Sequence, residues 1–188
     1  MVIQCSGRDH NRCLRGQQRA PPRGATLQDI LTPAPYDRAM LTARTETSLD
    51  IHHPLLRRLL DLWNAKRGDR PMPVRADFDV FELKDWLGNL MLIEVLPEAS
   101  EFRYRLYGSV LASYYNRDLT GKLTAALAPE TRDIVRREYG EVCVLRRPMT
   151  VERKRSVKHS ERMVAKLILP LAGPDDAVHM ILVASYPL

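Results

Sequence analysis

Few residues in this sequence have the types and spacing that enzyme chemistry requires. The chain contains no HExxH zinc motif, no GxSxG nucleophile elbow and no glycine-rich phosphate-binding loop. Ser109 follows Gly108 but does not stand in an elbow pattern. The acidic residues Asp77, Asp79 and Glu82 are spaced too irregularly to indicate a carboxylate pair for acid–base catalysis. We therefore expect a protein that is not an enzyme.

Metal-ligating side chains do not gather in the sequence either. Cys5, His10 and Cys13 would supply three ligands without a fourth, so no metal site is predicted. The three cysteines form no CxxC pair, and a disulfide between two of them would leave the third unpaired. This favours a reducing, cytoplasmic location. Cys143 lies on the apolar stripe of an expected helix and is interpreted as a small core residue.

Length and composition indicate one globular domain with a basic tail. The 188 residues are 45% hydrophobic and 28% charged, which excludes collagen and coiled coil. The longest apolar stretches, at 164–171 and 178–184, are strand-sized, so no membrane span is expected. The net charge of +6 is uneven, because residues 1–28 carry five arginines against one aspartate. The remaining chain is nearly balanced, so a nucleic-acid-binding surface is not expected on the folded part.

Residues 1–46 are predicted to be a disordered basic tail, followed by one folded domain over residues 47–188. Glutamine, proline and glycine interrupt any apolar period in the tail. The simplest interpretation is solvated chain, or an extension upstream of a true start at Met40. The alternatives are a weak anchor for nucleic acid or acidic lipid, and a transit-type peptide.

Apolar periodicity predicts the elements of the folded part. An amphipathic helix is expected over residues 49–65, with Asp50 as its cap and Leu56, Leu59 and Trp63 on its apolar stripe. Shorter helices are expected at 81–87 and at 110–115, the second capped by Ser109, and a longer helix at 129–145. Strands are expected at 89–95, 102–107, 149–156, 163–171 and 178–186.

The pattern within the strands indicates how the sheet must be covered. Residues 102–107 alternate strictly, so Phe102, Tyr104 and Leu106 are expected to share one face. The last two strands are apolar on both faces, whereas a lone antiparallel sheet usually leaves one face in water. The short helices are expected to cover one face, and the helix at 49–65 or a partner subunit to cover the other. The fold class is therefore α+β.

Four segments of the sequence resemble a known family. They are WNAKRGDRPMPVRADFD at 63–79, FRYRLYGS at 102–109, DLTGK at 118–122 and LPL at 169–171. With the order of elements, they resemble the PAS sensor domain, in particular short bacterial single-domain PAS proteins, over about residues 49–186. The resemblance implies a PAS-like five-stranded antiparallel sheet with short helices on one face and the N-terminal amphipathic helix on the other. It also implies a cavity between sheet and helices, and commonly a dimer partner on the outer face.

The resemblance suggests which residues could form the two functional surfaces. The expected cavity residues are Tyr104, Leu106, Ser109, Tyr114 and Asn116. Each also has a structural interpretation: the two tyrosines as core aromatics, the serine as a helix cap and the asparagine as a turn residue. The candidate interface of a homodimer is formed by Leu56, Leu59 and Trp63.

The cofactor is unknown, with haem and flavin disfavoured. Flavin photosensors of the family carry a cysteine motif in the helical region, where this sequence reads SVLASYYN at 109–116. Haem sensors need an axial histidine, and none occurs between residues 109 and 145.

Together these observations predict a non-enzymatic PAS sensory or adaptor protein that senses a small ligand or signal. Because the sequence ends at Leu188, right after the last expected strand, the signal is expected to leave through homodimerisation or an unidentified signalling protein. The alternatives are a constitutive protein-interaction scaffold with no ligand, and a weak nucleic-acid binder that uses the arginine-rich tail.

Overall fold

The computed structural model describes residues 49–97, 101–157 and 160–188. The expected tail at 1–46, with Cys5, His10 and Cys13, lies outside the described residues, so its interpretations stay predictions. Across the described ranges, no helix combines the length and the hydropathy needed to cross a membrane.

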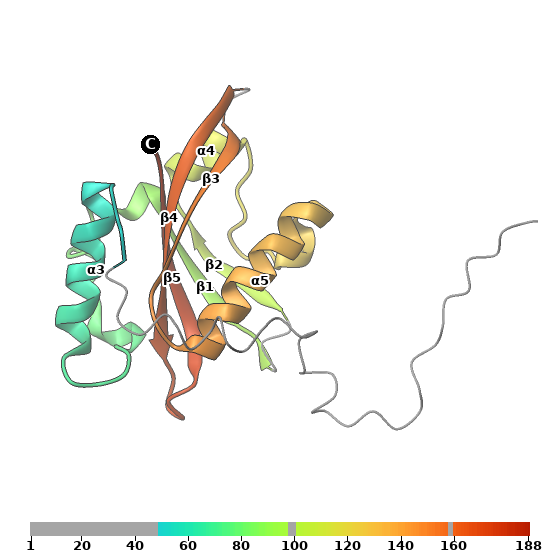
Figure 1. The fold of residues 1–188 in the computed structure, drawn as a ribbon. Helices are drawn as coiled ribbons and strands as arrows, with labels where there is room; N and C mark the ends of the chain where they lie inside the picture. The colour runs from blue at the N-terminus through green and yellow to red at the C-terminus, as the bar shows by residue number, and fades with distance from the viewer. Residues whose placement is uncertain (1–48, 98–100, 158–159) are drawn as a thin grey trace, which may run out of the picture. The chain divides into compact units, whose positions relative to one another are not determined.

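The domain is built on a five-stranded antiparallel sheet (Figure 1), as the sequence predicts. The strand order is β2-β1-β5-β4-β3, so the last strand of the chain lies between the first and the fourth. This central position explains why β4 and β5 are apolar on both faces: Leu169 on one face and Ile168 on the other are both 0% exposed. The strands are β1 (Leu90–Val95), β2 (Phe102–Tyr107), β3 (Met149–Val157), β4 (Ser160–Ala172) and β5 (Val178–Pro187).

Helices lie on both faces of the sheet, which confirms the α+β fold class (Figure 1). The amphipathic helix α3 (Pro54–Arg67) lies on one side, and α5 (Pro129–Leu145) lies on the other. Helix α4 (Ser109–Tyr115) and the 3-10 turn η4 (Thr124–Ala126) connect β2 to α5. The segment between β2 and β3 thus supplies the helices that face the inner side of the sheet.

Helix α3 covers the outer face with the residues proposed above as a dimer interface. Leu56 and Leu59 are 0% exposed, and the indole nitrogen of Trp63 donates a 2.9 Å hydrogen bond to the backbone oxygen of Pro170 in β4. These three side chains are interior residues of this chain and cannot also contact a partner. The interface assignment of Leu56, Leu59 and Trp63 is therefore corrected: the helix covers its own sheet, so a second copy would need another surface.

Three local expectations differ from the structure, each for a backbone reason. Helix α3 begins at Pro54 rather than at residue 49, because proline disfavours helical geometry in the residue before it. The segment 81–86 forms successive turns in place of the expected helix, and the Asp79 carboxylate accepts from the Phe81 amide at 2.7 Å. Ser109 is the first residue of α4, and Gly108 takes the N-cap position that was expected for the serine.

Gly108 fits its position because the backbone passes too close for any side chain. A Cβ atom at this residue would lie 2.3 Å from the carbonyl oxygen of Gly88, far inside van der Waals contact. The same approach places α4 against the 3-10 turn η2 (Leu87–Asn89), which leads into β1. This contact fixes where α4 begins relative to the inner face of the sheet.

Candidate ligand-binding site

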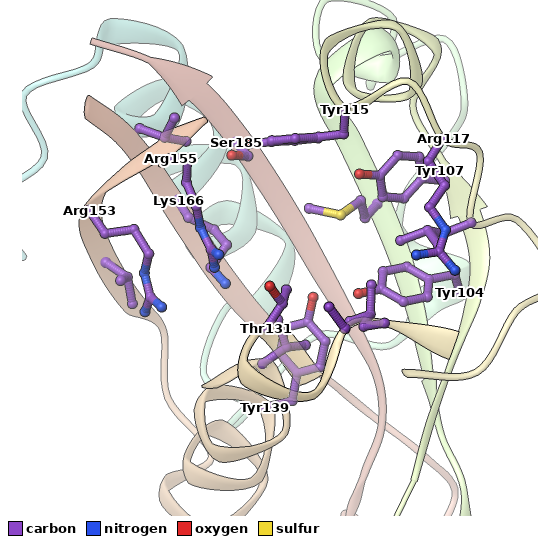
Figure 2. A pocket seen from close by; sticks show the side chains of 17 residues that line it. Tyr104, Tyr107, Tyr115, Arg117, Thr131, Tyr139, Arg153, Arg155, Lys166 and Ser185 are labelled. Carbon is purple, nitrogen blue, oxygen red and sulfur yellow. The ribbon is translucent and has the colours of Figure 1, made fainter. Parts of the chain in front are cut away.

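A cavity of about 370 Å³ lies between the inner face of the sheet and the helices α4 and α5 (Figure 2). All five strands contribute side chains to its wall, among them Met91 of β1, Val164 of β4 and Ser185 of β5. The ladder places Lys166 opposite both Val151 and Ser185, which confirms that these side chains share one face of the sheet. The cavity is thus a built feature of the fold and not a surface depression on one element.

Four tyrosines form the aromatic part of the wall: Tyr104, Tyr107, Tyr115 and Tyr139. The rings of Tyr104 and Tyr107 meet edge to face with centroids 5.7 Å apart, and the hydroxyls of Tyr104 and Tyr139 share a hydrogen bond. Burial raises the pKa of Tyr104 to about 12, so this phenol is neutral at physiological pH. Such rings offer a ligand apolar faces together with hydroxyl groups.

Tyr104 lines the cavity as expected, but Leu106 does not, because β2 carries a bulge. The register pairs Tyr104 with Ile93, then Leu106 with Leu92 and Tyr107 with Met91, so Arg105 is an extra residue without a partner position. One extra residue reverses the face of every later side chain in the strand. Leu106 therefore turns to the outer face, and Tyr107 takes the cavity position that strict alternation assigned to Leu106.

The three polar candidates near α4 also lie outside the cavity wall. Ser109 and Asn116 are exposed, and Asn116 ends the helix in the left-handed conformation, with φ of 49°. Tyr114 is half-buried, packs against the core and does not line the cavity. Tyr115 lines it instead, because it lies four residues after the buried Leu111 and so on the same helical face.

The opposite part of the wall is cationic, which the sequence interpretation missed. Arg153 and Arg155 of β3 and Lys166 of β4 line the cavity, together with Arg117 from the segment after α4. Figure 2 shows the first three on one side of the cavity, facing Tyr104, Tyr107 and Arg117 across it. Lys166 stands inside the apolar run MVAKLILPLA, and this single lysine was the signal that could have located the site.

A buried carboxylate pairs with two of these cations. Glu138 of α5 forms ion pairs with Lys166 and with Arg153, and its side chain is only 8% exposed. The Lys166 side chain is 12% exposed, and its Nζ atom lies 5.6 Å from the ring centroid of Tyr139. Burial, followed by the charges of Arg153 and Arg155, lowers the pKa of Lys166, while contact with Glu138 favours the protonated ammonium.

A second polar cluster fastens the helical side to the sheet. The Glu101 carboxylate, just before β2, accepts from the Thr124 hydroxyl and from the Arg136 guanidinium of α5. Burial alone would raise the pKa of Glu101, but these hydrogen bonds and that of the Phe102 amide lower it below its usual value. The cluster ties η4 and α5 to the start of β2.

The side chains of the cavity wall decide whether haem or flavin could be attached there. Among the 17 residues that line it, all from the described part of the chain, there is no histidine for axial haem ligation and no cysteine for a flavin adduct. Cys143 lies on α5 outside the lining, and burial raises the pKa of its thiol to about 11. The described lining thus does not fit either of these two attachments.

Comparison with known proteins bears on the fold and the family. A family model described as PAS domain matches residues 51–184, which confirms the resemblance seen in the sequence. No curated protein matches the chain.

Solved structures with a similar fold include a sensory box sensor histidine kinase from Vibrio cholerae, with 16% identity over 58% of this chain and 88% of that one, and a TM-score of 0.43. The PAS domain of BvgS from Bordetella pertussis has 16% identity over 58% of this chain and 86% of that one, with a TM-score of 0.36. A fungal LOV domain photoreceptor has 18% identity over 72% and 92%, with a TM-score of 0.42.

Proposed function

Because the chain belongs to the PAS domain family, we propose that it is a non-enzymatic sensory or adaptor module whose cavity binds a small ligand. The bound state is passed to a second copy of the chain or to a separate signalling protein. The observation that supports this proposal is the cavity of about 370 Å³, which lies within the size range of ligand pockets, about 300–1,000 Å³.

The lining explains how a ligand would change the surface of the module. The wall includes Thr131, Val135 and Tyr139 of α5 and Tyr115 at the end of α4, so a bound molecule touches both helices and the sheet at once. A ligand that fits one packing of these helices better than another shifts the population toward that packing. The outer sides of α4 and α5 would then present a changed contact surface.

Two variants test whether a ligand in the cavity controls the oligomeric state. Ser185→Leu adds side-chain atoms to the buried cavity wall, whereas Ser109→Leu changes an exposed serine outside it. Native mass spectrometry of the full-length protein as purified should detect a retained small molecule in the wild type and in Ser109→Leu, and less or none in Ser185→Leu. Sizing with light scattering should show that ligand occupancy and oligomeric state change together.

The scaffold alternative predicts a different result. If the wild type carries no small molecule, and Ser185→Leu is folded with the same oligomeric state as the wild type, the module acts without a ligand. That outcome would contradict the sensory proposal.

A further inference from the structure

The cavity wall carries more cationic side chains than the neighbouring carboxylates can pair with. Four cationic side chains line it, from Arg117, Arg153, Arg155 and Lys166. Among the residues that the structure describes, Glu138 is the only carboxylate in ion-pair contact with any of them, and it contacts two. One carboxylate therefore faces four cations around the cavity.

Among the described residues, Arg117 and Arg155 form no ion pair, and Arg155 stands on β3 beside Arg153. The Arg155 side chain is half-buried, and within the described ranges no acidic group forms an ion pair with it. The Nε atom of Arg153 is buried without a hydrogen-bond partner among those residues. Holding cations close together in a partly buried wall is unfavourable unless an anion accompanies them. The cavity is the space in which such an anion would contact both guanidinium groups.

The rest of the wall indicates what the anion is attached to. Across the cavity from β3 and β4 stand the rings of Tyr104 and Tyr107, with Tyr139 beside them (Figure 2). Their apolar faces suit a flat or aliphatic body, and their hydroxyls suit a few polar substituents. A free inorganic ion would leave this aromatic side without contacts. The wall therefore matches a molecule with one anionic end and one apolar end.

We propose that the cavity binds an amphiphilic organic anion, whose carboxylate or phosphate group lies on Arg155, Arg153 and Lys166 and whose apolar body lies on the tyrosines. This inference deepens the proposed sensory function and rests on it. Guanidinium groups hold carboxylate and phosphate by charge-assisted, often bidentate hydrogen bonds, and these contacts set the orientation of the ligand.

The test uses probes that differ only in charge or head group. Binding of 3-phenylpropionate, 2-phenylethyl phosphate and the neutral 3-phenylpropionamide to the full-length protein is measured by calorimetry and by the shift in Tm. At least one of the two anions should bind at least about tenfold more tightly than the amide, because the charge-assisted contacts are lost with the charge. The comparison of the two anions identifies the preferred head group, with inorganic phosphate as the control that lacks a body.

A matched pair of arginine variants locates the binding. Arg155→Gln removes a cavity guanidinium, and Arg105→Gln removes one that is exposed on β2 outside the lining. Arg155→Gln should weaken binding of the preferred anion about tenfold or more, with an unchanged circular dichroism spectrum, and Arg105→Gln should bind like the wild type.

The outcomes separate this inference from the proposed function. A neutral or cationic molecule retained by the purified protein, equal binding of the amide and the anions, or full binding by Arg155→Gln would overturn the anion assignment and leave the sensory proposal standing. If none of the probes binds and no molecule is retained, both are refuted.

Discussion

Removing the charge of Glu138 should destabilise the domain strongly, because this carboxylate balances two cations inside it. Its side chain is 8% exposed, and those of Lys166 and Arg153 are 12% and 27% exposed. Breaking a buried ion pair from one side costs about 3–5 kcal/mol, since the remaining charge stays buried without its partner. We expect Glu138→Gln to lower the free energy of unfolding by about 3 kcal/mol, equivalent to a fall in Tm on the order of 10 °C.

The opposite change, Lys166→Met, should cost much less. Methionine fills a similar space without charge, and Glu138 keeps Arg153 as its partner. We expect its free energy of unfolding to lie within about 1 kcal/mol of the wild type. The control is Glu141→Gln, an exposed residue on the same helix, which should change stability by no more than about 0.5 kcal/mol.

Urea unfolding followed by circular dichroism measures all three variants, and an unchanged m-value establishes that they share one unfolding reaction. The expected order of loss is Glu138→Gln first, then Lys166→Met, then Glu141→Gln. If Lys166→Met is as damaging as Glu138→Gln, the charge of the lysine is needed for the stability of the fold, and no separate role in binding is required to explain it. If Glu138→Gln behaves like Glu141→Gln, the carboxylate does not balance the cavity charge, and the reasoning fails.

Three further predictions concern the frame around the cavity. Gly108→Ala should lower Tm sharply, because its Cβ would lie 2.3 Å from the Gly88 oxygen. Gly140→Ala in α5 should raise the free energy of unfolding by up to about 1 kcal/mol, because a Cβ there would have no atom within 4 Å. Thermal unfolding of both variants checks this prediction. Leu59→Asp should yield unfolded protein, since this side chain is 0% exposed under the sheet; a folded, smaller species on a sizing column would contradict it. Because the folded-state pKa of Glu101 is lowered from its usual 4.5, its contribution to stability is present above that pH and is lost as the pH falls below it. Glu101→Gln should therefore cost more stability at pH 7 than at pH 3 in urea titrations, and an equal cost at both values would refute the assignment.

The fold was predictable because its signals are local. Pro129 at the first turn and the apolar stripe behind it predict α5 with the bounds that the structure has, and the alternating residues predict β2 equally well. The apolar faces of β4 and β5 required covers on both sides, and α3 and α5 supply them. Where local signals conflicted, the prediction failed: Pro54 fixed the start of α3, although the apolar stripe extends before it.

The cavity residues were harder to predict, because their orientation depends on pairing between distant segments. The bulge that turns Tyr107 inward is defined only by the register between β1 and β2, and nothing in the sequence FRYRLY indicates an extra residue. Tyr115 and Tyr114 are adjacent, and only the direction in which α4 packs decides which of them faces the cavity. Such choices follow from tertiary packing, which a periodic pattern does not contain.

At Lys166 the residue type is not the one that the stability of the sheet would favour. It stands between Ala165 and Leu167 in a central strand, where an aliphatic side chain would satisfy the pattern and avoid the cost of burying charge. Glu138 lowers that cost, yet a buried ion pair of this kind is commonly replaced by apolar residues without loss of stability. A local rule broken in the middle of an otherwise consistent strand is typical of a functional site. The lysine is therefore better explained by the anion that the cavity would bind than by the stability of the sheet.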